Sequence, residues 1–435
     1  MSKENARIVK DIVDAMIFTL PVVVMEATYE RTRNKFIHTR TTPTDKIKYI
    51  ARPGVDTVFS RIQMDLLPSP LVLTVPPSKT EAYPEGRYCT YEILDCYMDC
   101  VALVGTGFLG GDDGGVYLLC GPEYKGPTPE GVVRIDIPSN MSWISCRNLF
   151  IKEEDVEEIR TIQEKMDIRP LDESRYVERI FPDLPTKGDG ALARVLAMSL
   201  PEYFNLYNYV AQENPPYVRD QEAAEKMRSY GIGAGLCFSM DQFPDGLAEE
   251  LSAQAWDRVK ERLYQRNDLL PKHNNWLYSA QNIARFETDY DYRGIIAYFG
   301  PAANPIEMAM YLTVSKDGDG QALNGKHRYR IRFPAGYLPP VEKMGFWSVT
   351  AYGEDQYLIG NPYDRFRISG KNPFAYHADG TLDLLIQEEA PADSEYFPNF
   401  LPCGADNFDL CLRLYLPGEK ARSGEWKAPY VERLD

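Results

Sequence analysis

Residues 55–66 read VDTVFSRIQMDL, a run rich in β-branched and aromatic residues that stops before Pro68. A shorter apolar run, LVLTV at 71–75, follows and is closed by two prolines. Further candidate strands lie at 87–97 and 116–120. Turn-forming residues therefore recur about every ten residues, which is typical of an all-β region. The pattern predicts a β-rich N-terminal domain over residues 1–150, with a leading helix.

The pattern changes after Arg147. Acidic residues open the next segment, and apolar residues in it recur at helical spacing. Helices are predicted at 153–166, 191–200, 220–230 and 247–264. The second of these is expected to stop before Pro201, because proline interrupts the hydrogen bonding of a helix. Residues 151–284 are therefore expected to form a mainly helical connecting segment.

An alternating pattern returns from about residue 285. Tyr329, Ile331 and Phe333 alternate with arginines, as expected for a strand with one buried face. Further strands are predicted at 346–352, 365–368, 382–386 and 408–415. Residues 285–435 are expected to form a C-terminal β domain. The whole chain is predicted to be an α+β protein, mainly β, in which two β domains flank the helical segment.

The N-terminus carries an apolar run, IFTLPVVVM at 17–25. Charged residues of both signs precede this run, and the apolar residues among them follow helical spacing. The start of a signal peptide is positively charged and does not carry acidic residues. The apolar run is also too short to span a bilayer. We therefore expect an amphipathic helix that ends near Pro21, followed by a buried segment, in a protein of the cytoplasm.

Composition narrows the classes of partner. The formal net charge is -16, and such a field repels nucleic acid and anionic membrane surfaces. The eight cysteines form no Cys-x-x-Cys pair, and the four histidines show no metal-binding spacing. We expect reduced cysteines and no metal site. A small molecule and a second copy of the chain are the partners that stay open.

Two motifs resemble ligand-binding signatures but lack the structural context that such sites need. Residues 105–110, GTGFLG, match Gly-x-Gly-x-x-Gly, yet a predicted strand follows where a dinucleotide site needs a helix. Residues 317–321, DGDGQ, resemble the start of a calcium loop, but Arg328 stands where that loop needs a glutamate. We interpret both motifs as loops and expect no cofactor.

Several blocks together resemble one family. Residues 53–60, PGVDTVFS, are similar to a Pro-Asn-x-Asp-Thr-x-Tyr-Ser signature, and residues 346–352, FWSVTAY, to a Phe-Trp-Ser-x-Thr-x-Tyr block. Further matching positions are Gly86, Arg87, Tyr88, Asp95, residues 399–402, residues 412–415 and Trp426. The chain thus resembles the uncharacterised family with paired domains of unknown function, numbered twelve-fifty-four at the N-terminus and twelve-fourteen at the C-terminus. Gly54 stands where the family usually has asparagine.

The resemblance implies two β-rich domains with helices between them, and a jelly-roll-like β-sandwich at the C-terminus. It implies no established activity, so candidate site residues have to come from the chemistry of the chain itself.

Polar residues inside apolar strands mark the candidate site, because a buried polar group is costly unless it is satisfied. The candidate ligand-binding residues are Asp56, Thr57, Ser60, Arg87 and Asp95 in the N-terminal domain and Tyr352, Arg413 and Tyr415 in the C-terminal domain. No catalytic residue is assigned. The alternative is that these residues form ion pairs and hydrogen bonds that fix strand ends.

Two C-terminal strands each carry one polar face opposite an apolar one. Ser348, Thr350 and Tyr352 share such a face, and so do Arg413 and Tyr415. Each polar face is expected either to face solvent or to line a ligand-binding concavity.

Two functions stay open on the sequence alone. The first is an enzyme that acts on a small organic molecule without a redox cofactor and moves protons through the polar residues named above. The second is a non-catalytic ligand-binding or assembly protein built on a β scaffold. An enzyme should gather carboxylates of perturbed pKa, whereas a scaffold should show a broad apolar or flat surface.

Overall fold

Two stacked sheets form the N-terminal part of the computed structural model, which describes residues 2–28, 33–48, 51–174, 176 and 190–435. The six-stranded sheet has the order β1 (Ile37–His38), β2 (Thr57–Asp65), β9 (Met141–Leu149), β4 (Cys89–Leu94), β5 (Cys100–Gly105) and β6 (Leu109–Gly110). The four-stranded sheet has the order β10 (Asp167–Pro170), β3 (Leu71–Val75), β7 (Gly115–Cys120) and β8 (Val133–Asp136). Apolar residues of both sheets meet in one core, and Cys89, Tyr91 and Ile93 face it as their alternation predicts. Helix α2 (Asp155–Lys165) follows β9.

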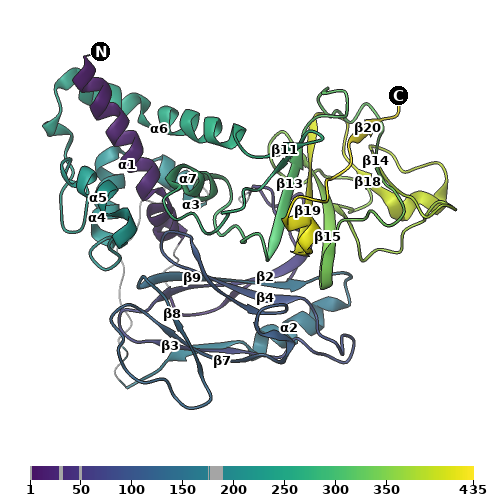
Figure 1. The fold of residues 1–435 in the computed structure, drawn as a ribbon, viewed down its shortest axis with the longest axis horizontal. Helices are drawn as coiled ribbons and strands as arrows, with labels where there is room; N and C mark the ends of the chain where they lie inside the picture. Colours follow the sequence, from purple (N-terminus) through teal and green to yellow (C-terminus); the bar gives the residue numbers. More distant parts are fainter. Residues whose placement is uncertain (1, 29–32, 49–50, 175, 177–189) are drawn as a thin grey trace.

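Helices form a second part beside these sheets (Figure 1). They are α1 (Lys3–Thr28), α3 (Ala191–Leu196), α4 (Leu200–Val210), α5 (Gln221–Arg228), α6 (Asp245–Asp268) and α7 (Tyr290–Phe299), with 3₁₀ turns at Val218–Asp220 and Met240–Gln242. Helix α1 packs against α7, α6, α3, α4 and α5, so the leading helix belongs by its packing to the helical part. In the described part of the chain, none of the helices has the length and apolar character needed to cross a membrane.

The expected end of the first helix near Pro21 is wrong. Helix α1 continues through Pro21 to Thr28. A proline inside a helix costs a hydrogen bond, which usually stops the helix there. The segment from Val22 to Met25 is almost fully buried, and packing of α1 against five other helices offsets that loss.

Pro201 begins a helix where we expected it only to end one. Helix α3 stops at Leu196, and α4 starts at Leu200 with Pro201 in its first turn. The Ser199 side chain accepts a hydrogen bond from the Glu202 backbone N–H, and the Glu202 carboxylate accepts one from the Ser199 N–H. This capping box and the tolerance of a helix start for proline explain the second helix.

Two further sheets form the C-terminal part. The six-stranded sheet has the order β11 (Lys272–His273), β12 (Trp276–Tyr278), β13 (Ala309–Val314), β19 (Phe408–Pro417), β15 (Val341–Gly353) and β16 (Arg367–Ser369). The four-stranded sheet has the order β18 (Phe400–Pro402), β17 (Leu382–Gln387), β14 (Tyr329–Phe333) and β20 (Val431–Arg433). A single apolar core joins residues of both sheets. The jelly-roll arrangement stays a prediction.

The protein is α+β, as expected, with β sheets at both ends and helices in the middle of the chain. The expectation that strands would dominate is wrong, because helix accounts for 28% of the structure and strand for 27%. The difference comes from helices that run longer than the sequence pattern suggested, as α1 does, and from α7, which the pattern did not reveal.

The outer face of the six-stranded N-terminal sheet is covered by both other parts of the molecule. At one end, Leu94 and Trp143 pack into the core of the helical part. At the other end, Tyr88 and Leu149 pack against Phe346 and other residues of the C-terminal sheet. Polar side chains occupy the middle of this face, so the three parts of the fold enclose them.

We expect the Ser199→Ala variant to lower the free energy of unfolding by about 1 kcal/mol, because it removes the side-chain cap of α4. Chemical denaturation followed by circular dichroism measures the change. The control is Ser229→Ala, since Ser229 follows α5 and its hydroxyl donates only to the Lys226 carbonyl. An equal effect of the two substitutions would contradict the capping role.

Candidate functional site

Asp56 lies at the contact between the N-terminal and C-terminal sheets. Its Oδ2 atom accepts hydrogen bonds from the Ser348 hydroxyl at 2.7 Å and from the Tyr415 hydroxyl at 3.2 Å. Its Oδ1 atom lies 3.5 Å from the Arg367 guanidinium. One N-terminal carboxylate thus binds three C-terminal side chains. Of these four residues, Asp56 and Tyr415 were among the candidate ligand-binding residues predicted from the sequence.

Arg413 and Tyr352 continue the same contact. The Arg413 guanidinium donates to the Tyr352 hydroxyl at 2.6 Å and to the backbone oxygen of Arg52 at 3.2 Å. The Tyr352 hydroxyl donates to the backbone oxygen of Pro53 at 2.8 Å, and burial raises the pKa of Tyr352 to about 12. The polar faces of β15 and β19 therefore do not face solvent, because the N-terminal domain covers them.

The other candidate residues lie elsewhere. Arg87 is fully buried and binds two carboxylates of α2, Asp155 at 3.0 Å and Glu158 at 2.7 Å. The Ser60 hydroxyl on β2 lies 2.8 Å from Nδ1 of His38, which belongs to the edge strand β1. These contacts match the alternative in which such residues fix the ends of strands and helices. Thr57 is buried at the start of β2, next to Asp56 in sequence.

Asp95 lines a surface hollow of about 640 Å³ at the opposite end of β4. Its carboxylate accepts hydrogen bonds from the Tyr217 hydroxyl at 2.7 Å and from the backbone N–H groups of Tyr97 and Asp99. Burial, together with the nearby charge of Asp99, raises the pKa of Asp95 to about 7. Each carboxylate oxygen of Asp95 has a partner, so this group shapes a loop as well as lining the hollow.

Glu92 and Arg147 form a buried ion pair on the covered face of the N-terminal sheet, and the sequence reasoning missed both. The Arg147 guanidinium lies 3.2 Å from Glu92 Oε2 and also donates to the backbone oxygen of Ala302. Glu92 Oε1 has no hydrogen-bond partner among the described residues. An unpartnered carboxyl oxygen in a fully buried side chain is rare in a folded protein and calls for a cause.

Glu92 stands in a row of polar side chains across three strands. Ser145 is its register neighbour on β9, and Arg61 is the neighbour of Ser145 on β2. Such neighbours have Cβ atoms about 5 Å apart on one face of the sheet. The Ser145 hydroxyl is fully buried and has no partner among the described residues. The indole N–H of Trp143, two residues earlier on β9, is likewise buried and has no partner among the described residues. Glu92, Ser145 and Trp143 thus each carry an unpartnered polar atom and share one face of the sheet.

Burial raises the pKa of Glu92 to about 8, although Arg147 acts in the opposite direction through its charge and its hydrogen bond. Two further groups act on the Glu92 carboxyl: Glu307 raises its pKa and Arg285 lowers it. These two residues form an ion pair with each other in the segments before and after α7. Burial therefore favours the protonated form of the Glu92 carboxyl, against the effect of Arg147.

Tyr311 connects this row to the contact around Asp56. Tyr311 on β13 is the register neighbour of Arg413, which in turn is the neighbour of Ser348. The Tyr311 hydroxyl accepts a hydrogen bond from Asn304 at 2.7 Å, and the Arg147 charge acts on this hydroxyl. We define the junction site as Asp56, Glu92, Ser145, Arg147, Tyr311, Ser348, Arg413 and Tyr415.

Gly54 borders the junction site. A side chain at this position would approach the Tyr415 hydroxyl, since a Cβ atom there would lie 3.8 Å from it. The asparagine that the resemblance implies at this position would therefore reach the junction, and this chain presents only backbone there.

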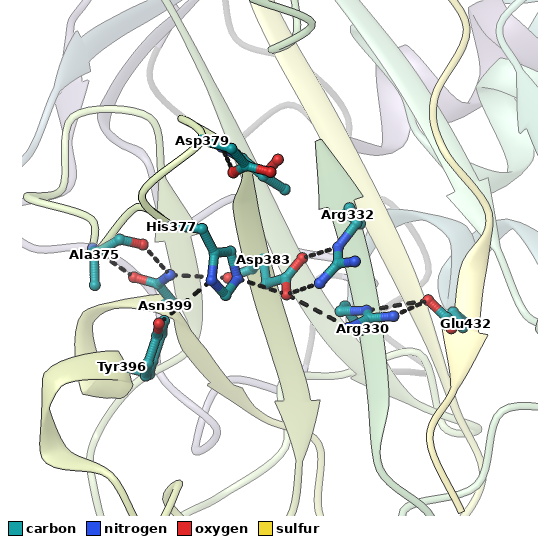
Figure 2. A network of polar contacts seen from close by, with 10 residues as sticks. Arg330, Arg332, Ala375, His377, Asp379, Asp383, Tyr396, Asn399 and Glu432 are labelled. Carbon is teal, nitrogen blue, oxygen red and sulfur yellow. Dashed lines mark hydrogen bonds and ion pairs between the residues drawn. The ribbon is translucent and has the colours of Figure 1, made fainter. Parts of the chain in front are cut away.

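A second polar network lies on the four-stranded C-terminal sheet, whereas the C-terminal residues of the junction site lie on the six-stranded one. Figure 2 shows Asp383 between His377 and Arg332, with Arg330 directed toward Glu432. Asp383 accepts two bonds of 2.7 Å from Arg332, and His377 Nε2 lies 2.9 Å from it. Asp383, Arg332, Arg330 and Glu432 all have partners of opposite charge, so the network binds β14, β17 and β20 together.

No set of three or more His, Cys, Asp or Glu residues within the described ranges is arranged to hold a metal ion. The eight cysteines are all described, and all are free thiols.

Two family models match the chain. Residues 33–170 match the model described as protein of unknown function DUF1254, and residues 308–419 match protein of unknown function DUF1214. The junction site takes Asp56, Glu92, Ser145 and Arg147 from the first range and Tyr311, Ser348, Arg413 and Tyr415 from the second. A search among curated proteins gives no match.

A solved structure shares the fold. The crystal structure of the VPA0106 protein from Vibrio parahaemolyticus is similar with a TM-score of 0.71 and 20% sequence identity, over 98% of this chain and 100% of that one. An uncharacterised protein from Burkholderia cenocepacia aligns with a TM-score of 0.46 and 10% identity, over 99% of this chain and 93% of that one. The first likeness shows that the whole chain shares one fold with that protein.

We expect Arg87→Met to lower the free energy of unfolding by about 3–5 kcal/mol, because it leaves the buried Asp155 carboxylate without its cation. Arg160→Met is the matched control, since the Arg160–Glu157 pair is exposed and contributes at most about 1 kcal/mol. Urea denaturation of both variants gives the comparison. A stable Arg87→Met variant that has lost ligand binding would instead place Arg87 in a functional site.

We expect Asp383→Asn to lower the free energy of unfolding by about 1.5–3 kcal/mol near neutral pH. Burial alone would raise the pKa of Asp383, but hydrogen bonds from Arg332 and His377 outweigh it and lower the pKa. A lowered pKa in the folded state means that the ionised carboxylate stabilises the fold above the unfolded pKa and loses this effect as the pH falls. The difference between wild type and variant should therefore shrink below about pH 4, and a difference independent of pH would contradict the role of the charge.

Proposed function

We propose that the two domains of this chain together form an enzyme site for a small organic molecule. The chain belongs to the family that pairs an N-terminal DUF1254 domain with a C-terminal DUF1214 domain. The observation that supports the proposal is the Glu92 carboxyl, fully buried at the junction with one oxygen unpartnered. Its location between the two domains gives a reason for both to occur in one chain.

Glu92 has the properties of a general acid–base group. A carboxyl with a pKa near the working pH exchanges its proton readily, and enzymes reach such values by burial. The pKa of Glu92 is raised to about 8 by burial. Its free oxygen is the atom that would donate a proton to a substrate or take one from it.

Neighbouring groups support the positioning of a substrate. Arg147 holds Glu92 Oε2 and thereby fixes the orientation of the carboxyl group. The Ser145 hydroxyl, adjacent by register and unpartnered, offers a hydrogen bond to a bound molecule. Arg147 and Ser145 are therefore proposed as positioning groups, and the reaction is proposed to need no redox cofactor.

The alternative function, a non-catalytic ligand-binding protein, is favoured by a different observation. The hollow of about 640 Å³ beside Asp95 has rigid walls that include Pro122, Pro138, Pro215 and Pro216. Rigid walls with a few polar groups suit ligand binding without chemistry. Turnover that depends on Glu92 separates the two functions, since a ligand held in the hollow would not need Glu92.

We propose further that the protein lies in the cytoplasm and that its partner is a small molecule, with a second copy of the chain as a further partner. Its negative charge disfavours nucleic acid and anionic membranes as partners.

We expect Glu92→Gln to keep the fold and to be more stable than the wild type at alkaline pH. The folded pKa of Glu92 is raised, so the wild type loses stability as the pH rises from the unfolded value toward about 8, by up to about 1.4 kcal/mol per pH unit. Glutamine does not titrate and escapes this loss. Denaturation curves at pH 6, 7, 8 and 9 give the difference in stability.

The same variant tests catalysis. Any compound that the wild type turns over should bind Glu92→Gln but remain unconverted. Infrared difference spectroscopy of the wild type against Glu92→Gln gives the pKa of the Glu92 carboxyl. A pKa near the ordinary value for glutamate would contradict the acid–base role, and so would full turnover by the variant.

A further inference from the structure

Three side chains of the C-terminal part form a connected series that lies outside the junction site. Asp383 lies on β17, His377 in the loop before that strand, and Tyr396 in the 3₁₀ turn Ser394–Asn399 (Figure 2). His377 Nε2 lies 2.9 Å from Asp383 Oδ2, and the Tyr396 hydroxyl lies 3.5 Å from His377 Nδ1. Each nitrogen of the imidazole ring thus has one polar neighbour, a carboxylate on one side and a phenol on the other.

The Asp383 carboxylate decides which nitrogen of His377 carries the proton. Burial alone would raise the pKa of Asp383, but hydrogen bonds from Arg332 and His377 lower it. An ionised carboxylate only accepts hydrogen bonds, so Nε2 is the protonated nitrogen of the neutral ring. Nδ1 then keeps its lone pair, which is free to take the proton of the Tyr396 hydroxyl.

A carboxylate, an imidazole and a hydroxyl in this order are the groups with which proteins activate a hydroxyl nucleophile. The carboxylate orients the ring, and the ring takes the proton as the oxygen attacks. The 3.5 Å between Tyr396 and His377 is longer than a tight hydrogen bond. Catalytic hydrogen bonds are often long in the free protein and tighten when a reactant is bound.

Asn399 holds the parts of this series together. Its side-chain oxygen accepts a hydrogen bond from the Ala375 N–H at 2.9 Å. Its amide nitrogen donates to the Ala375 carbonyl at 2.7 Å and to the Asp383 carbonyl at 2.9 Å. Asn399 is fully buried and ends the turn that carries Tyr396. The loop, the turn and β17 are thus fixed to one another, so base and hydroxyl are in place before a reactant arrives.

The reacting groups are accessible from solvent. The His377 side chain is 35% exposed, and Tyr396 is half-buried. The Asp383 carboxylate behind them is only 7% exposed. A reactant can therefore reach the hydroxyl and the ring without entering the interior of the protein.

The charges around Tyr396 narrow the class of reactant. Residues 388–399, which include Tyr396, carry four carboxylates and no lysine or arginine. The two arginines on the neighbouring strand β14 are already paired, Arg332 with Asp383 and Arg330 with Glu432. A phosphate dianion would be repelled by this surface, whereas a neutral acyl donor would not.

We infer that Tyr396 is a nucleophile that accepts an acyl group from an activated ester, with His377 as its base and Asp383 as the residue that positions His377. This modification site is separate from the junction site and does not depend on the function proposed there. In the reaction, the Tyr396 oxygen bonds to the acyl carbon, and the bond from that carbon to the donor oxygen breaks. His377 Nδ1 takes the hydroxyl proton and passes it to the leaving alcohol. The product is an ester of Tyr396.

Acetylation of the full-length protein by 4-nitrophenyl acetate tests the inference. Tyr376 is the internal reference, since it is 47% exposed and its hydroxyl has no hydrogen-bond partner in the described part of the chain. Exposure alone would make Tyr376 react faster. We expect Tyr396 to react faster by about tenfold or more, because a positioned base assists it. Mass spectrometry of the peptides over time gives both rates, and a rate at Tyr396 equal to or below that at Tyr376 would overturn the inference.

His377→Gln separates activation from packing. Glutamine still donates a hydrogen bond to Asp383 but is not a base, so the rate at Tyr396 should fall about tenfold or more while the rate at Tyr376 stays the same. The matched control is His327→Gln, because His327 lies 3.4 Å from Asp435 instead, and it should change neither rate. An unchanged rate at Tyr396 in a folded His377→Gln protein would contradict the inference. The comparison of the two tyrosines in the wild type decides the question even where a substitution disturbs the fold.

The class of the transferred group is tested with 4-nitrophenyl phosphate. This reagent has the same leaving group and offers a phosphoryl group in place of an acetyl group. We expect no phosphate on Tyr396, because the surrounding carboxylates repel the reagent. Phosphorylation of Tyr396 as fast as its acetylation would contradict the assignment to acyl groups.

Discussion

The constraint on which the structure depends is the burial of the second face of the six-stranded N-terminal sheet. One face of this sheet packs against its partner sheet, as in any two-layer domain. The other face is covered at one end by the helices around α1 and at the other end by the C-terminal sheet. The middle of that face carries Glu92, Ser145 and Arg147, which are enclosed only because both neighbours are present.

This arrangement explains why the contact between the domains is polar. A buried polar side chain needs a partner, and across the contact the two domains supply partners to each other. Asp56 receives hydrogen bonds from Ser348 and Tyr415, and Arg413 donates to the backbone of Arg52. Glu92 Oε1 and the Ser145 hydroxyl have no hydrogen-bond partner among the described residues, and the two residues are register neighbours on β4 and β9.

Much of the fold could be predicted from the sequence where the local pattern was clear. Leu71–Val75 and Tyr329–Phe333 are strands with the predicted bounds. Strand Met141–Leu149 was missed, because both of its faces are buried and its four polar residues hide the alternation. Helix α1 passes Pro21 because of its tertiary contacts, since five other helices pack around it.

The site could be predicted only in part. Asp56 and Arg413 were proposed to act together, and they lie at one contact, where Asp56 binds Tyr415 and Arg413 binds Tyr352. Arg87 and Asp95 were grouped with them but lie just beyond opposite ends of β4. Glu92 was missed because its importance comes from burial under the C-terminal part and from an oxygen without a partner. Neither property has a signal in the residues around it in the chain.

The central claim is that the junction encloses a carboxyl group that is protonated at neutral pH. Neutron diffraction from crystals of the full-length protein, exchanged into heavy water at pH 7, tests it most directly, because deuterium positions are visible in the resulting map. The account predicts deuterium on the Glu92 carboxyl, with Arg147 beside its Oε2 atom. A bare Glu92 carboxylate with both oxygens hydrogen-bonded to ordered water would contradict the account.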